Sequence, residues 1–149
     1  MELKGTKMIA GSPLRLYQAL VNPKVLLGAM PGLKRLEPTG PGAYSAEMEM
    51  GVSSIRGRYQ GELVIDETAP PEAYRLHMKG QGPGGFIDVA MDVQLEIQGS
   101  ATALHYTGDA KVGGRVAGVG QRLLGGVASL VLTQFFSAIE EHLNAHHEA

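Results

Sequence analysis

The sequence predicts an α+β fold in which a strongly curved antiparallel sheet grips one long C-terminal helix. Hydrophobic and polar residues alternate with a period of two through most of residues 43–112, which indicates strands that are wet on one face. Two short helical segments separate an opening strand from this region. Residues 115–142 then change to helical character and are apolar nearly all round the central turns, which is typical of a buried helix.

Local signals predict the first elements. Residues 2–9 alternate as a short strand. Ser12-Pro13 begins an amphipathic helix, because serine caps helix N-termini and proline fits the first helical position. Pro23 ends this helix. A second helical turn at 24–29 then runs into a chain reversal at 30–32.

The alternating region predicts a meander. After a weak strand candidate at 33–37, short turns divide it into strands at residues 43–50, 55–65, 74–79, 87–97 and 102–112. Strands joined in this way pair antiparallel. So few strands cannot close into a barrel, so the long helix must cover the concave face, as in a helix-grip fold. Gly57, Gly61 and Gly108 lie on the inward side, where they permit bends and leave empty volume beneath the helix.

Composition limits the classes of function. With 149 residues, 44% of them hydrophobic, the chain is expected to form one domain over residues 1–149. It has no cysteine, which excludes disulfides, thiolate catalysis and cysteine-ligated metals. A net charge of −2 disfavours nucleic-acid binding. The 21 glycines exceed ordinary usage, so we expect them to have structural roles.

The last helix is too long for a compact domain if it is unbroken. A helix over residues 115–147 would measure roughly 50 Å, against a domain diameter of roughly 40 Å. We therefore expect a weakened first segment and a frayed tail after Leu143, with a break at Gly125-Gly126 as the alternative. Residues 123–139 carry no formal charge, which makes a membrane role a minority interpretation beside a buried helix.

Several segments together resemble a known family. They are the opening strand, the turn at 30–32, the run AKVGGRVAGVGQRLL at 110–124, and Gln134-Phe135-Phe136. With them the chain resembles, over essentially its whole length, the carbon monoxide dehydrogenase G-subunit (CoxG) family. That family belongs to the START-like (SRPBCC, Bet v 1-like) superfamily of polyketide cyclases, lipid-transfer proteins and plant allergens.

The resemblance implies a small accessory protein. Such proteins are often encoded beside molybdenum hydroxylases of the carbon monoxide dehydrogenase type, and are associated with membrane recruitment and with a quinone-class electron acceptor. Some members have a hydrophobic C-terminal extension, whereas this sequence ends in a polar tail at Ala149. The N-terminal residues do not resemble a secretory signal. We therefore expect a cytoplasmic protein, with peripheral contact at the inner face of the membrane.

The inward side chains are the main candidate site. We expect them to line a ligand cavity: Met48, Met50, Tyr59, Leu63, Met78, Met91, Val93, Tyr106, Leu123 and Val127. The methionines give a compliant, polarizable wall for an apolar ligand. Tyr59 and Tyr106 offer hydroxyls to a ligand carbonyl. The alternative is that these side chains fill the core completely.

A second set of residues is expected to form a gate and a partner-binding loop: Met30, Pro31, Gly32, Gly113, Gly114 and Gly118. The glycine run around them lacks the order of a nucleotide-binding loop.

The remaining polar residues favour neither catalysis nor metal binding. Ser53 and Ser54 have no base nearby in sequence, so we assign no catalytic residue. His142, His146 and His147 have metal-like spacing but are expected to form a polar tail. His77, His105, Asp88 and Asp92 lie on the outward side of their strands. Two interpretations stay open for Lys34, Arg35, Arg56 and Arg58, a basic docking surface or ordinary solvated faces.

Three functions follow from these observations. The first is a non-catalytic carrier of a quinone- or lipid-like molecule, without a resident cofactor or metal, which presents its ligand to a partner enzyme. The second is a START-like cyclase or hydrolase acting on a hydrophobic substrate. The third is a membrane-recruiting adaptor. The sequence fixes neither the ligand nor the oligomeric state.

Overall fold

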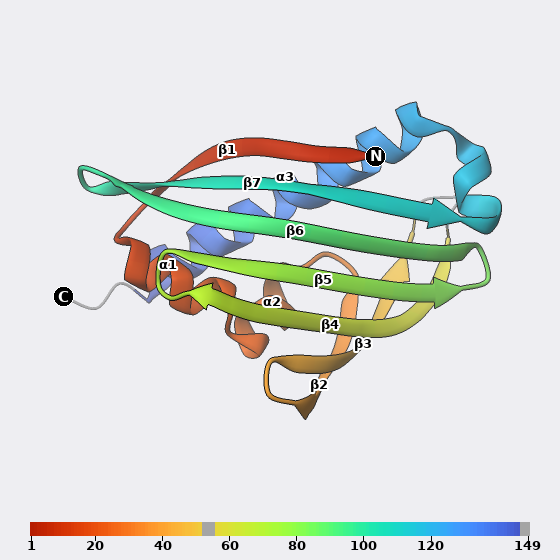
Figure 1. Ribbon diagram of the computed structural model, residues 1–149, viewed down its shortest axis with the longest axis horizontal. Helices are drawn as coiled ribbons and strands as arrows, with labels where there is room; N and C mark the ends of the chain where they lie inside the picture. Colours follow the sequence, from red (N-terminus) through yellow and green to blue (C-terminus); the bar gives the residue numbers. More distant parts are fainter. Residues whose placement is uncertain (52–55, 147–149) are drawn as a thin grey trace.

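The computed structural model describes residues 1–51 and 56–146 (Figure 1). Ser53, Ser54, Ile55 and His147 therefore lie outside the described residues. In chain order the elements are β1 (Glu2–Ala10), α1 (Pro13–Leu20), α2 (Pro23–Ala29), β2 (Leu33–Gly40), β3 (Ala43–Met50), β4 (Gly57–Ala69), β5 (Ala73–Gly82), β6 (Gly85–Gln98), β7 (Ala101–Gly113), the 3₁₀ helix η2 (Gly114–Val119) and α3 (Gln121–Ala145).

One antiparallel sheet carries the fold. Its strand order is β1-β7-β6-β5-β4-β3-β2, so the meander is consecutive and β1 joins it by pairing with β7. Figure 1 shows the long strands curving in front of α3, with α1 and α2 near one end of the sheet. The predicted fold class, a curved antiparallel sheet gripping a long C-terminal helix, is confirmed. The segment at 33–37, a weak candidate in the sequence, is a strand that pairs with β3.

The two short helices begin as their sequences indicate. The Ser12 hydroxyl accepts a hydrogen bond from the Arg15 amide at 3.3 Å, and the Asn22 side chain accepts one from the Lys24 amide at 2.9 Å. A proline follows each cap at the first helical turn, where its missing N–H costs nothing. The cap and the proline therefore determine the first residue of each helix in the connection between β1 and β2.

Gly61 lines a small pocket of about 40 Å³, but at each of the three strand glycines an added Cβ would collide with neighbouring atoms. A Cβ on Gly61 would collide with the backbone carbonyl oxygen of Lys79, and one on Gly108 with that of Ala90. At Gly57 the Pro83 side chain occupies the corresponding space. These glycines therefore allow close backbone approach, as strand bends require.

The chain breaks before α3, at Gly120 (φ 92°). The weakened first segment is the 3₁₀ helix η2, and α3 is continuous through Gly125-Gly126. Its 25 residues span about 38 Å, which fits the domain. The helix extends past Leu143 to Ala145, and the Arg15 guanidinium donates to the carbonyl oxygens of Leu143 at 2.9 Å and His146 at 3.1 Å.

Two clusters of buried side chains lie between the sheet and the helices. The larger joins α1, α2 and the C-terminal half of α3 to the sheet, and includes the fully buried Leu16 and Ile139. The smaller, at the η2 end, is built from Tyr59, Val116 and Leu124.

Candidate functional site

A cavity of about 230 Å³ lies between the concave face of the sheet and α3. Its walls come from both sheet edges, from the loop after α2 and from α3. An engineered apolar cavity of about 150 Å³ already holds benzene, whereas drug-sized ligands occupy roughly 300–1,000 Å³. The space therefore suits a compact or slender apolar group. The alternative that side chains fill this region completely is wrong.

The cavity wall is rich in methionine, whose sulfur atom is polarizable. Of the seven methionines in the chain, six line the cavity: Met1, Met30, Met48, Met50, Met78 and Met91. Thioether side chains are flexible and make favourable contacts with aromatic rings. The wall can adapt its shape to an apolar guest.

The structure brings most of the predicted site residues together. The residues of the predicted set that line the cavity are Met48, Met50, Leu63, Met78, Met91, Val93, Tyr106 and Val127. They come from five strands of the sheet and from α3.

Leu123 and Tyr59 do not line this cavity. Leu123 is 39% exposed, and Leu124 lines the cavity wall instead. The reason is that α3 begins only after Gly120, so its inward face differs from that of a helix that runs continuously from residue 115. Tyr59 is buried in an adjoining pocket of about 40 Å³. A Cβ on Gly84 would lie 2.5 Å from the Tyr59 hydroxyl oxygen, so that hydroxyl lies against the β5–β6 turn.

Several lining residues were missed at the sequence level. Tyr74 shares its inward parity with Leu76 and Met78, so alternation alone would have found it. Phe135 and Phe136 are buried and also line the wall. Their place on α3 depends on the helix rotation, which the strand pattern does not fix.

An aromatic pair, Tyr17 of α1 and the cavity-lining Tyr74 of β5, lies beside the cavity. The Tyr17 and Tyr74 rings meet edge to face at 5.8 Å, and the Tyr17 hydroxyl donates to Glu67 Oε1 at 2.9 Å. Burial raises the pKa of Tyr74 well above its ordinary value, and Tyr17 adds to the effect. Burial and the Glu67 carboxylate raise the pKa of Tyr17 in the same direction. Both phenols are neutral donors at physiological pH.

The predicted gate residues are held to different degrees. Met30 lines the cavity. Gly32 (φ 82°) packs so closely on β3 that a Cβ would meet the Glu49 carbonyl oxygen, and the Glu49 amide donates to the Gly32 carbonyl at 2.8 Å. Gly113 lies under the Phe86 ring. Pro31 is half-buried between Met30 and Gly32.

The η2 end of the gate is only partly packed. Gly114 (φ 77°) packs on Gly85, and the Val116 amide donates to the Gly84 carbonyl at 2.8 Å. Gly118, by contrast, faces open space. The gate stays a prediction.

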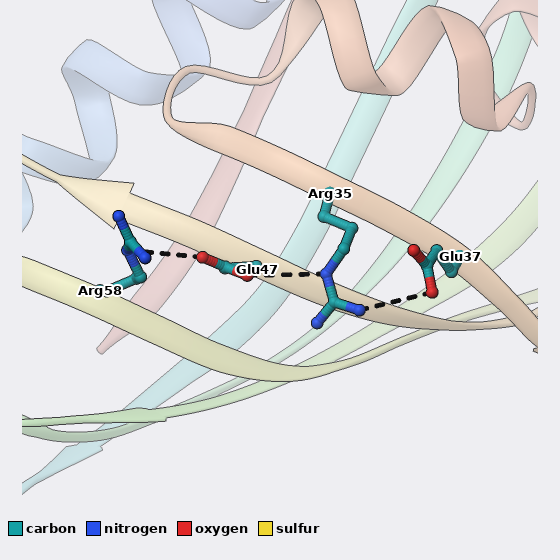
Figure 2. Close-up of polar contacts among 4 residues, drawn as sticks. All are labelled: Arg35, Glu37, Glu47 and Arg58. Carbon is teal, nitrogen blue, oxygen red and sulfur yellow. Dashed lines mark hydrogen bonds and ion pairs between the residues drawn. The ribbon is translucent and has the colours of Figure 1, made fainter.

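The outer face of the sheet carries mixed, paired charges. Figure 2 shows a chain of contacts from Arg58 to Glu47 (3.4 Å), Glu47 to Arg35 (3.6 Å) and Arg35 to Glu37 (3.4 Å). Two of the four residues considered for a basic docking surface are therefore paired with carboxylates, which favours the solvated-face interpretation.

The outward histidines and aspartates also pair across strands. His77 Nε2 lies 2.7 Å from Asp88 Oδ1, and the Arg75 guanidinium donates to Asp92 Oδ1 at 2.7 Å. His105 Nδ1 lies 2.9 Å from the Thr6 hydroxyl. These contacts lie outside the cavity and contribute to the sheet surface.

The C-terminal histidines form a stack. The His142 and His146 rings lie 4.4 Å apart, and burial, His146 and Arg15 lower the pKa of His142. Within residues 1–51 and 56–146, no group of three or more His, Asp or Glu side chains has the arrangement of a metal site.

By length and composition alone, α3 is apolar enough to cross a membrane, with a mean hydropathy of 1.5. Only 22% of its apolar window is buried, so α3 is not the largely buried helix that the sequence predicted, although it lines the cavity and packs against α1 and α2.

A curved antiparallel sheet that encloses an apolar cavity against its C-terminal helix defines a START-like, helix-grip protein. The chain belongs to the carbon monoxide dehydrogenase G-subunit (CoxG) family, whose model matches residues 5–144. No match to a curated protein sequence was found.

Solved structures agree with this fold. A conserved protein from Geobacillus kaustophilus is 32% identical, with 97% of this chain and 96% of that chain covered and a TM-score of 0.94. A START superfamily protein from Mycobacterium smegmatis is 13% identical over 97% of both chains, with a TM-score of 0.74. Ara h 8.0201 is 14% identical over 98% of this chain and 99% of that chain, with a TM-score of 0.70. Family and fold together support a hydrophobic-ligand-binding protein.

Proposed function

We propose that this protein is a non-catalytic carrier that takes up a quinone- or lipid-like molecule between its sheet and α3. The observation that carries the proposal is the apolar cavity with its methionine-rich wall. Among the described lining residues there is no Asp, Glu, His, Lys, Arg, Ser or Thr, so the wall provides binding without an acid–base pair or a nucleophile. This composition supports a carrier over the cyclase alternative.

A substitution that fills the cavity tests the carrier function. Ala128 lines the cavity from α3, whereas its neighbour Ser129 is exposed on the same helix. Ala128→Phe should lower the affinity for N-phenyl-1-naphthylamine, a fluorescent apolar probe, by at least about tenfold, because the new ring occupies ligand space. Ser129→Phe is the matched control and should bind like the wild type.

Native mass spectrometry and ligand-binding measurements test the carrier function further. Native mass spectrometry of the protein from its own host should show a co-purifying apolar molecule. The carrier function would be contradicted by two results together: a mass without any bound ligand, and no binding of the fluorescent probe, ubiquinone-1 or palmitate by the wild type.

The partner and the location are proposed on family membership. The ligand would pass to or from a molybdenum hydroxylase of the carbon monoxide dehydrogenase type, at the inner face of the membrane. The Met30–Leu33 loop and η2 would form the docking and gating region, because both border the cavity.

A further inference from the structure

A well-enclosed polar group in the cavity wall forms no hydrogen bond with the described residues. Tyr74, at the start of β5, is 6% exposed and lines the cavity. Its ring packs edge-on against Tyr17, but the Tyr17 hydroxyl turns to Glu67. In the part of the chain that the structure describes, the Tyr74 hydroxyl forms no hydrogen bond.

The Tyr74 hydroxyl is not fully enclosed by protein atoms. Across the described residues, no polar side-chain atom is both fully enclosed and without a hydrogen-bond partner. Since the Tyr74 hydroxyl lacks a partner, it keeps some accessible surface, and Tyr74 is one of the residues that line the cavity. A buried hydroxyl facing only apolar groups is unfavourable, so a ligand that supplies an acceptor gains binding energy there.

Tyr74 differs from the two tyrosines expected from the sequence in its position and enclosure, although the Tyr106 hydroxyl likewise forms no hydrogen bond with the described residues. Tyr59 lies in the adjoining pocket with its hydroxyl at Gly84. The Tyr106 hydroxyl lies over Gly5 of the edge strand β1, where a Cβ would come within 2.5 Å of it. Tyr74 is the most enclosed tyrosine of the main cavity wall.

We propose that Tyr74 is the specificity-determining residue of the cavity, and that its hydroxyl donates a hydrogen bond to an uncharged carbonyl oxygen on an otherwise apolar ligand. This inference rests on the proposed carrier function. The acceptor is uncharged because no Lys, Arg or His of the described lining is present to compensate a carboxylate in so apolar a space. Burial also keeps the phenol protonated, so it acts as the donor.

A matched pair of ligands isolates this hydrogen bond. Butyrophenone and n-butylbenzene have nearly the same shape and differ by a carbonyl in place of a methylene. Their dissociation constants would be measured by displacement of N-phenyl-1-naphthylamine from the wild type, Tyr74→Phe and Tyr106→Phe. Tyr74→Phe should reduce the preference for the ketone by about 3- to 10-fold, because one neutral hydrogen bond is lost. Its affinity for n-butylbenzene should not change.

The control and the second measurement make each outcome decisive. Tyr106→Phe should reduce the preference less than Tyr74→Phe does, and an equal or larger loss in Tyr106→Phe overturns the assignment to Tyr74. Infrared spectroscopy of butyrophenone bound to the wild-type protein should show the carbonyl stretch at a lower wavenumber than in hexane. An unshifted carbonyl stretch would also overturn the assignment to Tyr74. If n-butylbenzene binds but the preference does not respond to Tyr74→Phe, only this inference fails. If the wild type binds neither these ligands nor the fluorescent probe, ubiquinone-1 or palmitate, the carrier function fails with it.

Discussion

Gly61 and Gly80 are directly opposed in the β4–β5 ladder, yet they have opposite tolerances for a side chain. A Cβ on Gly61 would collide with the Lys79 carbonyl oxygen, whereas the nearest heavy atom to a Cβ on Gly80 is Tyr59 Cβ at 3.9 Å. Alternation in the sequence places both positions on the inward side but gives no sign of this difference. Backbone separation across a bent ladder is a property of the folded sheet, not of either strand alone.

This pair gives a prediction about stability. Gly61→Ala should lower the free energy of unfolding by at least about 2 kcal/mol, because the backbone must move to admit the methyl group. Gly80→Ala should change it by less than about 1 kcal/mol, and in the stabilising direction, because alanine loses less conformational freedom on folding. Urea titrations followed by circular dichroism measure both. Equal losses at the two positions would contradict a bend that depends on close backbone approach at Gly61.

At the level of elements, strands were easier to predict than helix rotation. The period of two placed β3 to β7 and most of the cavity wall, because a strand with one wet face must alternate. The start of α3 could not be placed, since its glycine-rich approach is compatible with several break points. The break at Gly120 rotates the helix so that Leu124 faces inward and Leu123 outward. The unpartnered hydroxyl of Tyr74 was likewise beyond sequence reasoning, because it depends on where Tyr17 and Glu67 meet.

The same glycine-rich segment gives a prediction about motion. Gly118, Gly120, Gly125 and Gly126 would each have open space at an added Cβ, so little packing restrains this stretch. Without ligand, amides of residues 112–126 should exchange hydrogen faster than those of residues 127–139, and butyrophenone should slow the first group. Hydrogen exchange with mass spectrometry compares them. Equal protection in both segments would count against a gate.

On the whole-molecule scale, a carrier needs a docking surface that is separate from its ligand wall. Leu27 on α2 is 41% exposed and lies close in sequence to the loop at Met30, whereas Ile97 is 66% exposed near the C-terminal end of β6. Exposed apolar side chains that border a ligand entrance are suited to protein contact. Substitutions at Leu27 and Ile97 therefore test where a partner protein docks.

Leu27→Glu should weaken co-elution with a purified molybdenum hydroxylase of the carbon monoxide dehydrogenase type by about tenfold or more, because it buries a charge in the interface. Ile97→Glu, with the same change of charge at an exposed position outside the Met30–Leu33 loop and η2, should leave co-elution intact. Size-exclusion chromatography at matched concentrations makes the comparison. A wild-type protein that never co-elutes with the hydroxylase would contradict the proposed partner.

The methionine wall also makes the cavity vulnerable to damage. Oxidation of a thioether to the sulfoxide adds a polar oxygen to a flexible apolar side chain. Six such side chains face one cavity, so oxidants that enter an empty cavity would turn its wall hydrophilic and abolish its fit for apolar cargo. A bound ligand excludes the oxidant from the same sulfur atoms. If the protein is the proposed carrier, a bound ligand would protect these methionines, and the ligand-free protein would be oxidised fastest.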